Sequence, residues 1–253
     1  MALSGVRLPE GWVPAADTLN GRVVMITGAT GGLGRETALA CARAGASVVL
    51  VGRRVRELEK LYDALLEAGH AKPAVVPLNL ESATPAQYAE LAGMIEAEFG
   101  HLDGLLHAAA HFDGLTPISQ HRPDQWLRTL QVNLSAPFAL TQAMQPLLAQ
   151  REDAAVVFVL DDPERMRQAH WGAYGVAKAG LESMVAILHQ ETESTPVRVH
   201  ALLPAPMRTE LRRMAWFGED TMAQPTPEAT AQAAVYLLSA QATAARGAML
   251  DLR

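Results

Sequence analysis

Short apolar runs alternate with longer helical stretches through most of this chain, and this alternation limits its possible folds more than any other feature. The runs are apolar at every residue and not at every second one, as in VVMIT (23–27) and SVVLV (47–51). Strands of this kind are covered on both faces, which is typical of a parallel sheet. Because strands alternate with helices, right-handed crossovers are expected. The sequence therefore predicts an α/β fold with a doubly wound parallel sheet and helices on both of its faces.

Further strands are expected at 74–78, 102–110, 154–160, 197–203 and 247–251, and long helices over 123–150 and 172–193. Thr84-Pro85 is expected to begin a helix with a cap and a first-turn proline. Residues 1–20 are punctuated by proline and glycine and show no sustained period. They are predicted to form an N-terminal arm on the surface, followed by one domain over residues 21–253.

The composition argues against several classes of protein. The chain has 253 residues, 49% of them apolar, with 27 acidic and 21 basic residues and a net charge of −6. Nucleic-acid binding is not expected, because no excess of lysine and arginine exists to displace phosphate counterions. No apolar run approaches the length of a membrane span, and the first residues lack the apolar core of a signal peptide. The single cysteine, Cys41, allows no internal disulfide and suits a reducing compartment, so a cytoplasmic protein is expected.

A glycine-rich turn, TGATGGLG (27–34), follows the first apolar run and leads into a helix. Glycines let the backbone turn sharply and approach a pyrophosphate, where free N–H groups and the positive end of the helix dipole face the phosphates. A plain turn that needs positive φ is the alternative, but this glycine density between strand and helix favours phosphate binding. The candidate cofactor contacts in this turn are Gly28, Thr30, Gly32, Leu33 and Gly34.

The TGxxxGxG spacing of this turn resembles that of the short-chain dehydrogenase/reductase family in its compact single-domain form. The resemblance also rests on the pentad YGVAK (174–178) and on Asn133, and it covers nearly the whole chain from about residue 21. It implies a Rossmann-like fold, a nicotinamide cofactor and an oxidoreductase that interconverts a carbonyl and an alcohol on a small or medium organic substrate.

The end of the second apolar run bears on which nicotinamide cofactor is used. An enzyme that selects NAD usually places an acid there to accept from the ribose 2′-hydroxyl, but this chain has Gly52 followed by Arg53 and Arg54. Guanidinium groups near the ribose favour a 2′-phosphate, and Arg35 is a third candidate. The alternative is that these arginines are solvated residues at a helix start. NADP(H) is therefore expected, and NAD(H) less so.

Other positions depart from the family pattern. Asn79 stands before Leu80, at the position where the family has an aspartate that accepts a hydrogen bond from the adenine amino group. An asparagine can still accept this bond through its side-chain oxygen. The fourth strand is expected to end His107-Ala108-Ala109-Ala110, where the family has Asn-Asn-Ala-Gly. Ala108 cannot make the asparagine's cross-strand hydrogen bonds, although His107 can restore part of the polar network. Asn79, Leu80 and Ala109 remain candidate cofactor contacts.

Tyr174 and Lys178 are four residues apart, so on a helix both point to one face. A free tyrosine is a poor base at neutral pH, and a nearby ammonium favours its ionised form. The resemblance implies that Lys178 also binds the nicotinamide ribose and that Asn133 kinks its helix and holds a water in a proton relay. An ordinary i,i+4 pair and a buried asparagine with satisfied hydrogen bonds are the alternatives.

The family's catalytic serine, about thirteen positions before the tyrosine, is replaced by Asp161. An ionised Asp161 opposes negative charge on a substrate oxygen, and the loss of one donor there costs about 10²–10³ in rate. A protonated Asp161 can donate, but only if burial raises its pKa by several units. A third alternative is that Asp161 pairs with Arg165 or Arg167 and leaves the pocket.

Two segments near the C-terminal end are expected to complete the pocket. The run PAPMRT (204–209) is similar to the family's PGxxxT segment, which implies that Thr209 bonds the nicotinamide carboxamide. The stretch after it contains Met214, Trp216 and Phe217 and is either a mobile substrate cover or an apolar packing patch. Trp171 either lines the pocket or packs.

The leading hypothesis is an NADP(H)-dependent oxidoreductase with Tyr174, Lys178, Asn133 and Asp161 as catalytic residues. The alternative is an NADP-binding protein with weak or no catalysis, because Asp161 replaces the serine. A homodimer or homotetramer is expected from the apolar helices at 123–150 and 172–193. No metal is expected, because the histidines at 101, 107 and 111 lack neighbouring ligands.

Overall fold

The computed structural model describes residues 3–253. Within them, eight parallel strands form one sheet in the order β1-β8-β7-β6-β5-β2-β3-β4. The strands are β1 (Ser4–Val6), β2 (Val23–Thr27), β3 (Ser47–Gly52), β4 (Ala74–Pro77), β5 (Gly104–His107), β6 (Ala154–Val159), β7 (Val197–Leu203) and β8 (Ala248–Asp251).

The helices are α1 (Gly32–Arg43), α2 (Val55–Glu67), α3 (Pro85–Phe99), α4 (Pro123–Leu130), α5 (Ala136–Ala149), α6 (Pro163–Met166), α7 (Gly172–Thr192), α8 (Glu210–Ala215) and α9 (Glu228–Leu238). Short 3₁₀ turns lie at Ile118–Gln120, Thr221–Ala223 and Ala240–Ala245, and a π-helical turn at Gln131–Ser135. The start of α3 is as predicted, because the Thr84 side chain accepts from the Gln87 N–H and Pro85 is the first helical residue.

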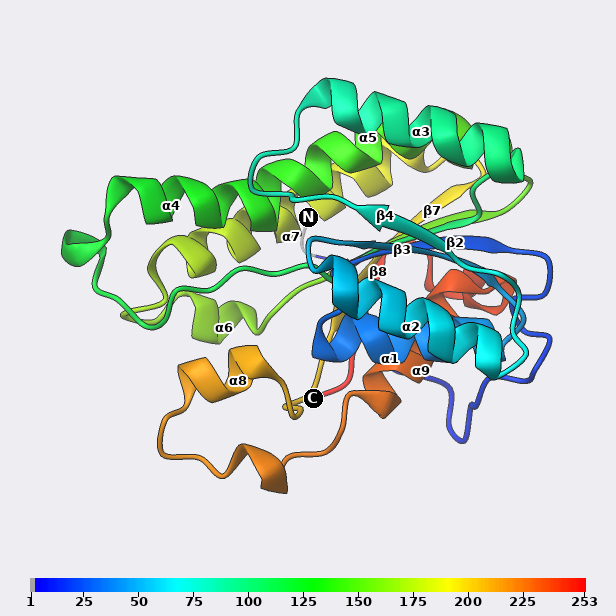
Figure 1. Ribbon diagram of the computed structural model, residues 1–253. Helices are drawn as coiled ribbons and strands as arrows, with labels where there is room; N and C mark the ends of the chain where they lie inside the picture. Colours follow the sequence, from blue (N-terminus) through cyan, green and yellow to red (C-terminus); the bar gives the residue numbers. More distant parts are fainter. Residues whose placement is uncertain (1–2) are drawn as a thin grey trace.

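Helices cover both faces of the sheet, with α3, α5 and α7 on one side and α1, α2 and α9 on the other (Figure 1). Successive residues of β2 point to opposite faces: Val24 and Ile26 pack with the α1 side, and Val23 and Met25 with the α5 side. Because both faces are buried, every residue of this strand is apolar or small. The predicted doubly wound parallel sheet is confirmed.

The strand order reverses between β2 and β5, and this reversal positions the site. The chain runs from β2 outward to β3 and β4, then returns to place β5 on the other side of β2 and continues outward to β8. The connections after β2 and β5 therefore leave the sheet toward opposite faces. In open α/β sheets the crevice beyond the carboxyl ends of the strands at such a reversal is where ligands bind.

The structure differs from the sequence prediction at the N-terminal segment and in the helix expected over 123–150. Residues 4–6 form β1, which pairs in parallel with β8, and Leu19 is fully buried in the core. The prediction missed this edge strand, because three residues of strand are too few to show a period, and it is wrong at Leu19, whose side chain lies in the core and not on the surface. The helix over 123–150 is divided into α4 and α5 by the π-helical turn at Gln131–Ser135.

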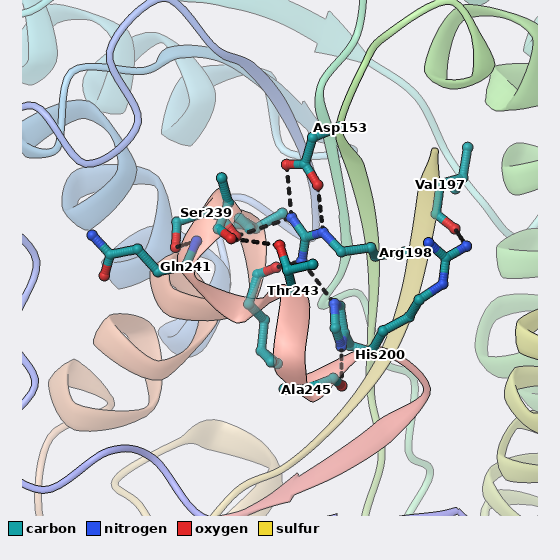
Figure 2. Close-up of polar contacts among 12 residues, drawn as sticks. Asp153, Val197, Arg198, His200, Ser239, Gln241, Thr243 and Ala245 are labelled. Carbon is teal, nitrogen blue, oxygen red and sulfur yellow. Dashed lines mark hydrogen bonds and ion pairs between the residues drawn. The ribbon is translucent and has the colours of Figure 1, made fainter. Parts of the chain in front are cut away.

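A buried polar network joins β6, β7 and the segment after α9 at the amino end of the strands (Figure 2). Arg198 Nε and Nη2 donate to Asp153 at 2.6 and 3.0 Å, and further N–H groups donate to the carbonyls of Leu237 and Ser239 at 3.0 and 2.9 Å. Arg22 also pairs with Asp153. A buried cation is tolerated here because its N–H groups face acceptors on several sides.

His200 completes this network in its neutral form. Its ring nitrogens lie 2.9 Å from Arg198 Nη1 and 2.9 Å from the carbonyl oxygen of Ala245. Burial, followed by the charge of Arg198, lowers the pKa of His200 to about 3. The neutral ring therefore accepts from Arg198 and donates to Ala245.

We predict that Asp153→Ala lowers the free energy of unfolding by about 3 kcal/mol, because it leaves a buried guanidinium without its carboxylate. Burial raises the pKa of Asp153, but the hydrogen bonds and charges of Arg198 and Arg22 outweigh burial and lower it below its usual value. A carboxyl group with a lowered folded-state pKa stabilises the fold at neutral pH. This contribution is lost as the pH falls below about 4, where the unfolded chain takes up the proton.

Urea denaturation at pH 7 and at acidic pH measures both effects. The control is Asp124→Ala, which removes an exposed partner of Arg122 and is expected to change stability by less than about 1 kcal/mol. Equal small losses for both variants at pH 7 would contradict the structural role of the network.

Candidate active site

A cleft of about 1260 Å³ lies over the carboxyl ends of the central strands. Small-molecule sites usually span about 300–1,000 Å³, so this cleft has room for an extended ligand. Most of the predicted site residues line it: Gly28, Thr30, Gly32, Leu33, Gly34, Arg53, Arg54, Asn79, Leu80, Ala109, Asp161, Tyr174, Lys178 and Thr209. Arg35 and Asn133 lie outside its lining.

The glycine-rich turn connects β2 to α1 beneath the cleft, and the protein's own packing requires two of its glycines. Gly28 has φ +66°, and a Cβ there would lie 2.7 Å from the Cα of Ala109, two residues beyond β5. A Cβ on Gly34 would lie 2.2 Å from the carbonyl oxygen of Gly28. These contacts bring the start of α1 against the sheet edge. The first turn of α1 carries no acidic residue, so its free N–H groups leave this edge suited to an anion.

The three arginines predicted to recognise a 2′-phosphate have different surroundings. Arg54 lies on the glycine-rich turn, where Nη2 donates to the Thr30 carbonyl and Nε to the Thr30 hydroxyl at 3.2 Å. Arg53 forms an ion pair with Glu81, which also lines the cleft. Arg35 is half exposed and lies 3.4 Å from Glu36. Arg54 is therefore held against the glycine-rich turn itself, whereas Arg53 is held by another residue of the cleft lining.

The ends of β2 and β5 are joined without the asparagine expected of the family. The hydroxyl of Thr27 accepts from the Ala109 N–H at 3.2 Å and donates to the Leu106 carbonyl at 3.4 Å. His107 instead points to Thr141, with Nε2 2.8 Å from its hydroxyl, and stacks on Phe158. Burial, and next the charge of Lys178, lowers the pKa of His107 to about 3, so it is neutral. Thr27 thus makes cross-strand bonds that Ala108 cannot make.

Tyr174 and Lys178 lie on the first turns of α7, and both are buried. Lys178 Nζ lies 5.6 Å from the centroid of the Tyr174 ring and donates to the Val159 carbonyl at 2.8 Å. Burial lowers the pKa of Lys178 to about 8, and the charge of Asp161 partly opposes this shift. The predicted pairing of the two side chains on one helix face is present.

Asp161, just beyond β6, is held in the cleft by several donors. Its Oδ1 accepts from Arg165 and, at 2.8 Å, from the backbone N–H of Asp162. The Tyr174 hydroxyl donates to its Oδ2 at 3.2 Å. Of the three alternatives drawn from the sequence, the pairing with Arg165 is present, but Asp161 does not leave the pocket. Its contacts with Arg165 and Asp162 are those of an ionised carboxylate.

This carboxylate changes the acidity of the tyrosine. Burial, and then the charge and hydrogen bond of Asp161, raise the pKa of Tyr174 well above its usual value, while the charge of Arg165 opposes the shift. From the sequence, Lys178 is expected to favour the tyrosinate. The structure also places the Asp161 carboxylate 3.2 Å from the hydroxyl, and this anion opposes that effect.

Asn133 lies in the π-helical turn, behind the cleft wall. Its Nδ2 donates to the carbonyls of Thr129 and His111, both at 2.8 Å, and its Oδ1 accepts from the His111 N–H at 3.2 Å. The side chain therefore fastens the segment after β5 to the helix. A π-helical turn leaves a backbone carbonyl free for such a bond, and these turns are frequent at functional sites.

An apolar cluster closes one end of the cleft. Phe112, Met166, Trp171 and Tyr174 pack with residues of α8 and with Trp216. Trp171 is buried in this cluster and lies outside the cleft lining, so it packs, whereas Leu211 and Met214 of α8 do line the cleft. Phe112 and Asp113 also line the cleft but are not among the predicted site residues. Their place in the segment after β5 is the signal that could have indicated them.

Comparison with known proteins identifies the family. Residues 22–219 match the family model for short chain dehydrogenases. The chain belongs to the short-chain dehydrogenase family. It is 36% identical over 214 residues to YciK, an uncharacterised oxidoreductase of Escherichia coli (strain K12), covering 85% of this chain and 84% of YciK. The protein is therefore an oxidoreductase of this family.

Solved structures agree with this assignment. A short chain dehydrogenase from Pseudomonas syringae has a TM-score of 0.90 and 38% identity, over 96% of this chain and 99% of that chain. A short chain dehydrogenase from Escherichia coli CFT073, complexed with NADPH, has a TM-score of 0.90 and 33% identity, over 94% of this chain and 99% of that chain. In residues 3–253 of the present protein, no helix is long and apolar enough to span a membrane.

We predict that Asp161→Asn lowers the pKa of the Tyr174 phenol, because it removes the anion that opposes tyrosinate formation. Ultraviolet difference spectra between the wild type and Tyr174→Phe isolate this phenol during an alkaline titration. The same difference between Asp161→Asn and the Asp161→Asn/Tyr174→Phe double variant follows the phenol without the carboxylate. In the wild type, Tyr174 is expected to stay protonated above pH 10. Superimposable titrations with and without the carboxylate would contradict the coupling.

Proposed function

We propose that this protein is an NADP(H)-dependent oxidoreductase that interconverts a carbonyl and an alcohol on a small or medium organic substrate. The observation that carries the proposal is that the Tyr174 hydroxyl and the Lys178 side chain line the same cleft as the glycine-rich turn. This arrangement joins a site suited to a pyrophosphate with a phenol able to exchange a proton. The family assignment supplies the class of reaction.

Different residues along the cleft bind the parts of the cofactor and move the proton. The free N–H groups at the start of α1 bind the pyrophosphate, and Lys178 binds the nicotinamide ribose. Thr209 caps α8 by accepting from the Arg212 N–H, so its hydroxyl hydrogen stays available to the nicotinamide carboxamide. When bound, a reduced nicotinamide supplies a hydride to the carbonyl carbon. Tyr174 gives the proton to the carbonyl oxygen, and Asn133, which fastens the segment after β5, is proposed to support the return of a proton through Lys178.

Preference for NADP(H) over NAD(H) is supported by the positive side chains near the second strand. Arg53 and Arg54 follow Gly52, where an acid would repel a 2′-phosphate. The structure from Escherichia coli CFT073 is a complex with NADPH, and one from Shigella flexneri 2a, 33% identical with a TM-score of 0.89 over 94% of this chain and 99% of that chain, is a complex with NADP. The cofactor is also expected to contact four further residues, since they line the cleft: Leu33, Asn79, Leu80 and Ala109.

A second candidate function is NADP binding with weak or no carbonyl chemistry. The observation in its favour is the hydrogen bond from Tyr174 to Asp161, since the one proton of the phenol is then directed away from a substrate oxygen. An ionised carboxylate beside that oxygen also opposes the charge that develops on it. Turnover measurements separate the two functions.

The outer helices carry exposed apolar side chains that bear on the assembly of the protein. Leu127 of α4, Phe138 of α5 and Ile187 of α7 are 65%, 53% and 56% exposed, which supports a homodimer or homotetramer formed through these helices. A cytoplasmic location and a substrate limited to small organic molecules are proposed with it.

We predict that Tyr174→Phe lowers carbonyl turnover by about 10²–10⁴-fold, the usual contribution of a positioned acid. Oxidation of NADPH with a panel of ketones and aldehydes measures this, and fluorescence titration shows whether NADPH still binds. Equal turnover by the wild type and the variant contradicts the proposed role of the phenol. NADPH binding without wild-type turnover favours the second candidate function.

We predict that Arg54→Ala weakens NADPH binding about tenfold or more and changes NADH binding little, because a charge-assisted contact to the 2′-phosphate is lost. The matched control is Arg56→Ala, which removes an exposed arginine of α2 that lies outside the cleft. Parallel losses of NADPH and NADH affinity would show that Arg54 only supports the turn.

A further inference from the structure

The hydrogen-bond donors at the reacting end of the cleft are already committed. The phenol of Tyr174 has one hydrogen, and it is donated to Asp161 Oδ2 at 3.2 Å. The ammonium of Lys178 donates one of its three hydrogens to the Val159 carbonyl at 2.8 Å, and the proposed function assigns the other two to the nicotinamide ribose. What remains at the Tyr174–Asp161 pair is a set of acceptors: the lone pairs of the phenol oxygen and those of the carboxylate. A substrate group that donates a hydrogen bond fits these acceptors directly, whereas a neutral carbonyl oxygen is bound only when the Tyr174 hydroxyl turns its hydrogen away from Asp161.

The ion pair of Asp161 is oriented with its negative end toward the cleft. Asp161 and Tyr174 line the cleft, but Arg165 lies outside the lining. The guanidinium of Arg165 lies 5.8 and 5.1 Å from the ring centroids of Trp171 and Trp216. These contacts fix the cation behind the carboxylate. A group in the cleft is therefore closer to the carboxylate of Asp161 than to the guanidinium of Arg165. The ion pair as a whole attracts a positively charged group there.

The other charged groups at this end do not reverse that preference. Asp113 adds a second carboxylate to the lining, and His111 lies 3.1 Å from it. Arg213 pairs with Glu210, and Arg208 donates to the carbonyls of Met222 and Gln224. Lys178 is the remaining cation near Tyr174; burial lowers its pKa to about 8, which leaves it largely protonated at neutral pH, so two carboxylates, Asp161 and Asp113, are set against one ammonium in this part of the lining.

Aromatic rings add to the attraction for a cation. Phe112 and Tyr174 both line the cleft, with ring centroids 5.2 Å apart in an edge-to-face arrangement. Ring faces attract cations, by about 0.5–2 kcal/mol where water is excluded.

We propose that this site reduces protonated carbon–nitrogen double bonds, converting cyclic imines to secondary amines, and that Asp161 determines this specificity. A protonated imine brings both features that the Tyr174–Asp161 pair lacks, an N–H donor and a positive charge. The carboxylate favours the protonated form of the bound imine, which is the electrophilic form. The proposal rests on the proposed function, because it uses the same cleft and the same reduced nicotinamide dinucleotide.

The step balances without proton transfer from Tyr174. The carbon of the iminium group accepts the hydride of NADPH, a new C–H bond forms, and the carbon–nitrogen π pair becomes the lone pair of the amine. The substrate is reduced by two electrons and NADPH is oxidised to NADP⁺. No oxyanion develops, so the serine missing at position 161 is not needed for this reaction. In carbonyl reduction, by contrast, Asp161 lies beside a substrate oxygen on which negative charge develops.

The first test compares 2-methyl-1-pyrroline with cyclopentanone, a neutral ketone of similar shape, by the oxidation of NADPH. We expect Asp161→Ser to lower kcat/KM for the imine about tenfold or more and to raise it for the ketone about tenfold or more, because the change exchanges an anion for a donor. Asp161→Asn tests the charge at nearly constant shape and is expected to lower imine turnover similarly. The matched control is Glu164→Gln, which removes an exposed negative charge three residues away and is expected to change neither activity.

The second test measures binding without turnover. Calorimetric titration of the NADP⁺-loaded protein with 2-methylpyrrolidine, a cation at neutral pH, reports the affinity of the site for the amine. We expect Asp161→Asn to weaken this binding about tenfold and Glu164→Gln to leave it unchanged.

The outcomes separate this proposal from the proposed function. Opposite changes in imine and ketone turnover, together with weaker amine binding, support it. NADPH binding with an unchanged amine affinity in Asp161→Asn, or with imine and ketone turnover that fall together in Asp161→Ser, overturns the imine specificity and leaves the proposed function standing. Failure of NADPH to bind the wild-type protein overturns both.

Discussion

The reversal of strand order between β2 and β5 is the constraint on which the rest of the site depends. The two strands end side by side, with Thr27 opposite His107, and their following segments leave toward opposite faces of the sheet. The crevice between these segments exists only if the two turns approach each other closely. Gly28 makes that approach possible, because a side chain there would collide with the backbone of Ala109. The packing at the sheet edge thus requires this glycine whether or not a ligand is bound.

Two clusters around arginine show how the same kind of pair serves different ends. At the amino end of the strands, Arg198 is buried among Asp153, His200 and backbone carbonyls, and its hydrogen bonds hold β6, β7 and the end of α9 together. At the carboxyl end, Arg165 also holds a carboxylate, but that carboxylate faces the open cleft. The first pair is closed and structural. The second leaves acceptors directed at a ligand, which gives the site its proposed preference for a cation.

The sequence predicted most of the fold because its signals are local and repeated. Apolar runs gave the central strands and the parallel sheet, and spacing gave the glycine-rich turn and the pairing of Tyr174 with Lys178. The three residues of β1 were missed, because an edge strand pairs through backbone groups that carry no pattern of side chains. The state of Asp161 stayed open, since it depends on where Arg165 and the Tyr174 hydroxyl lie in space. The cross-strand hydrogen bonds of Thr27 were not predicted for the same reason, because Thr27 and its partners lie far apart in the chain.

The central claim is that an ionised carboxylate beside the phenol determines what this site accepts. The most direct measurement is a crystal structure of the protein with NADP⁺ and 2-methylpyrrolidine bound together. The account predicts the nicotinamide ring beside Tyr174 and the ammonium nitrogen about 3 Å from the carboxylate of Asp161. An amine located away from Asp161, or a nicotinamide that lies outside this cleft, would contradict it.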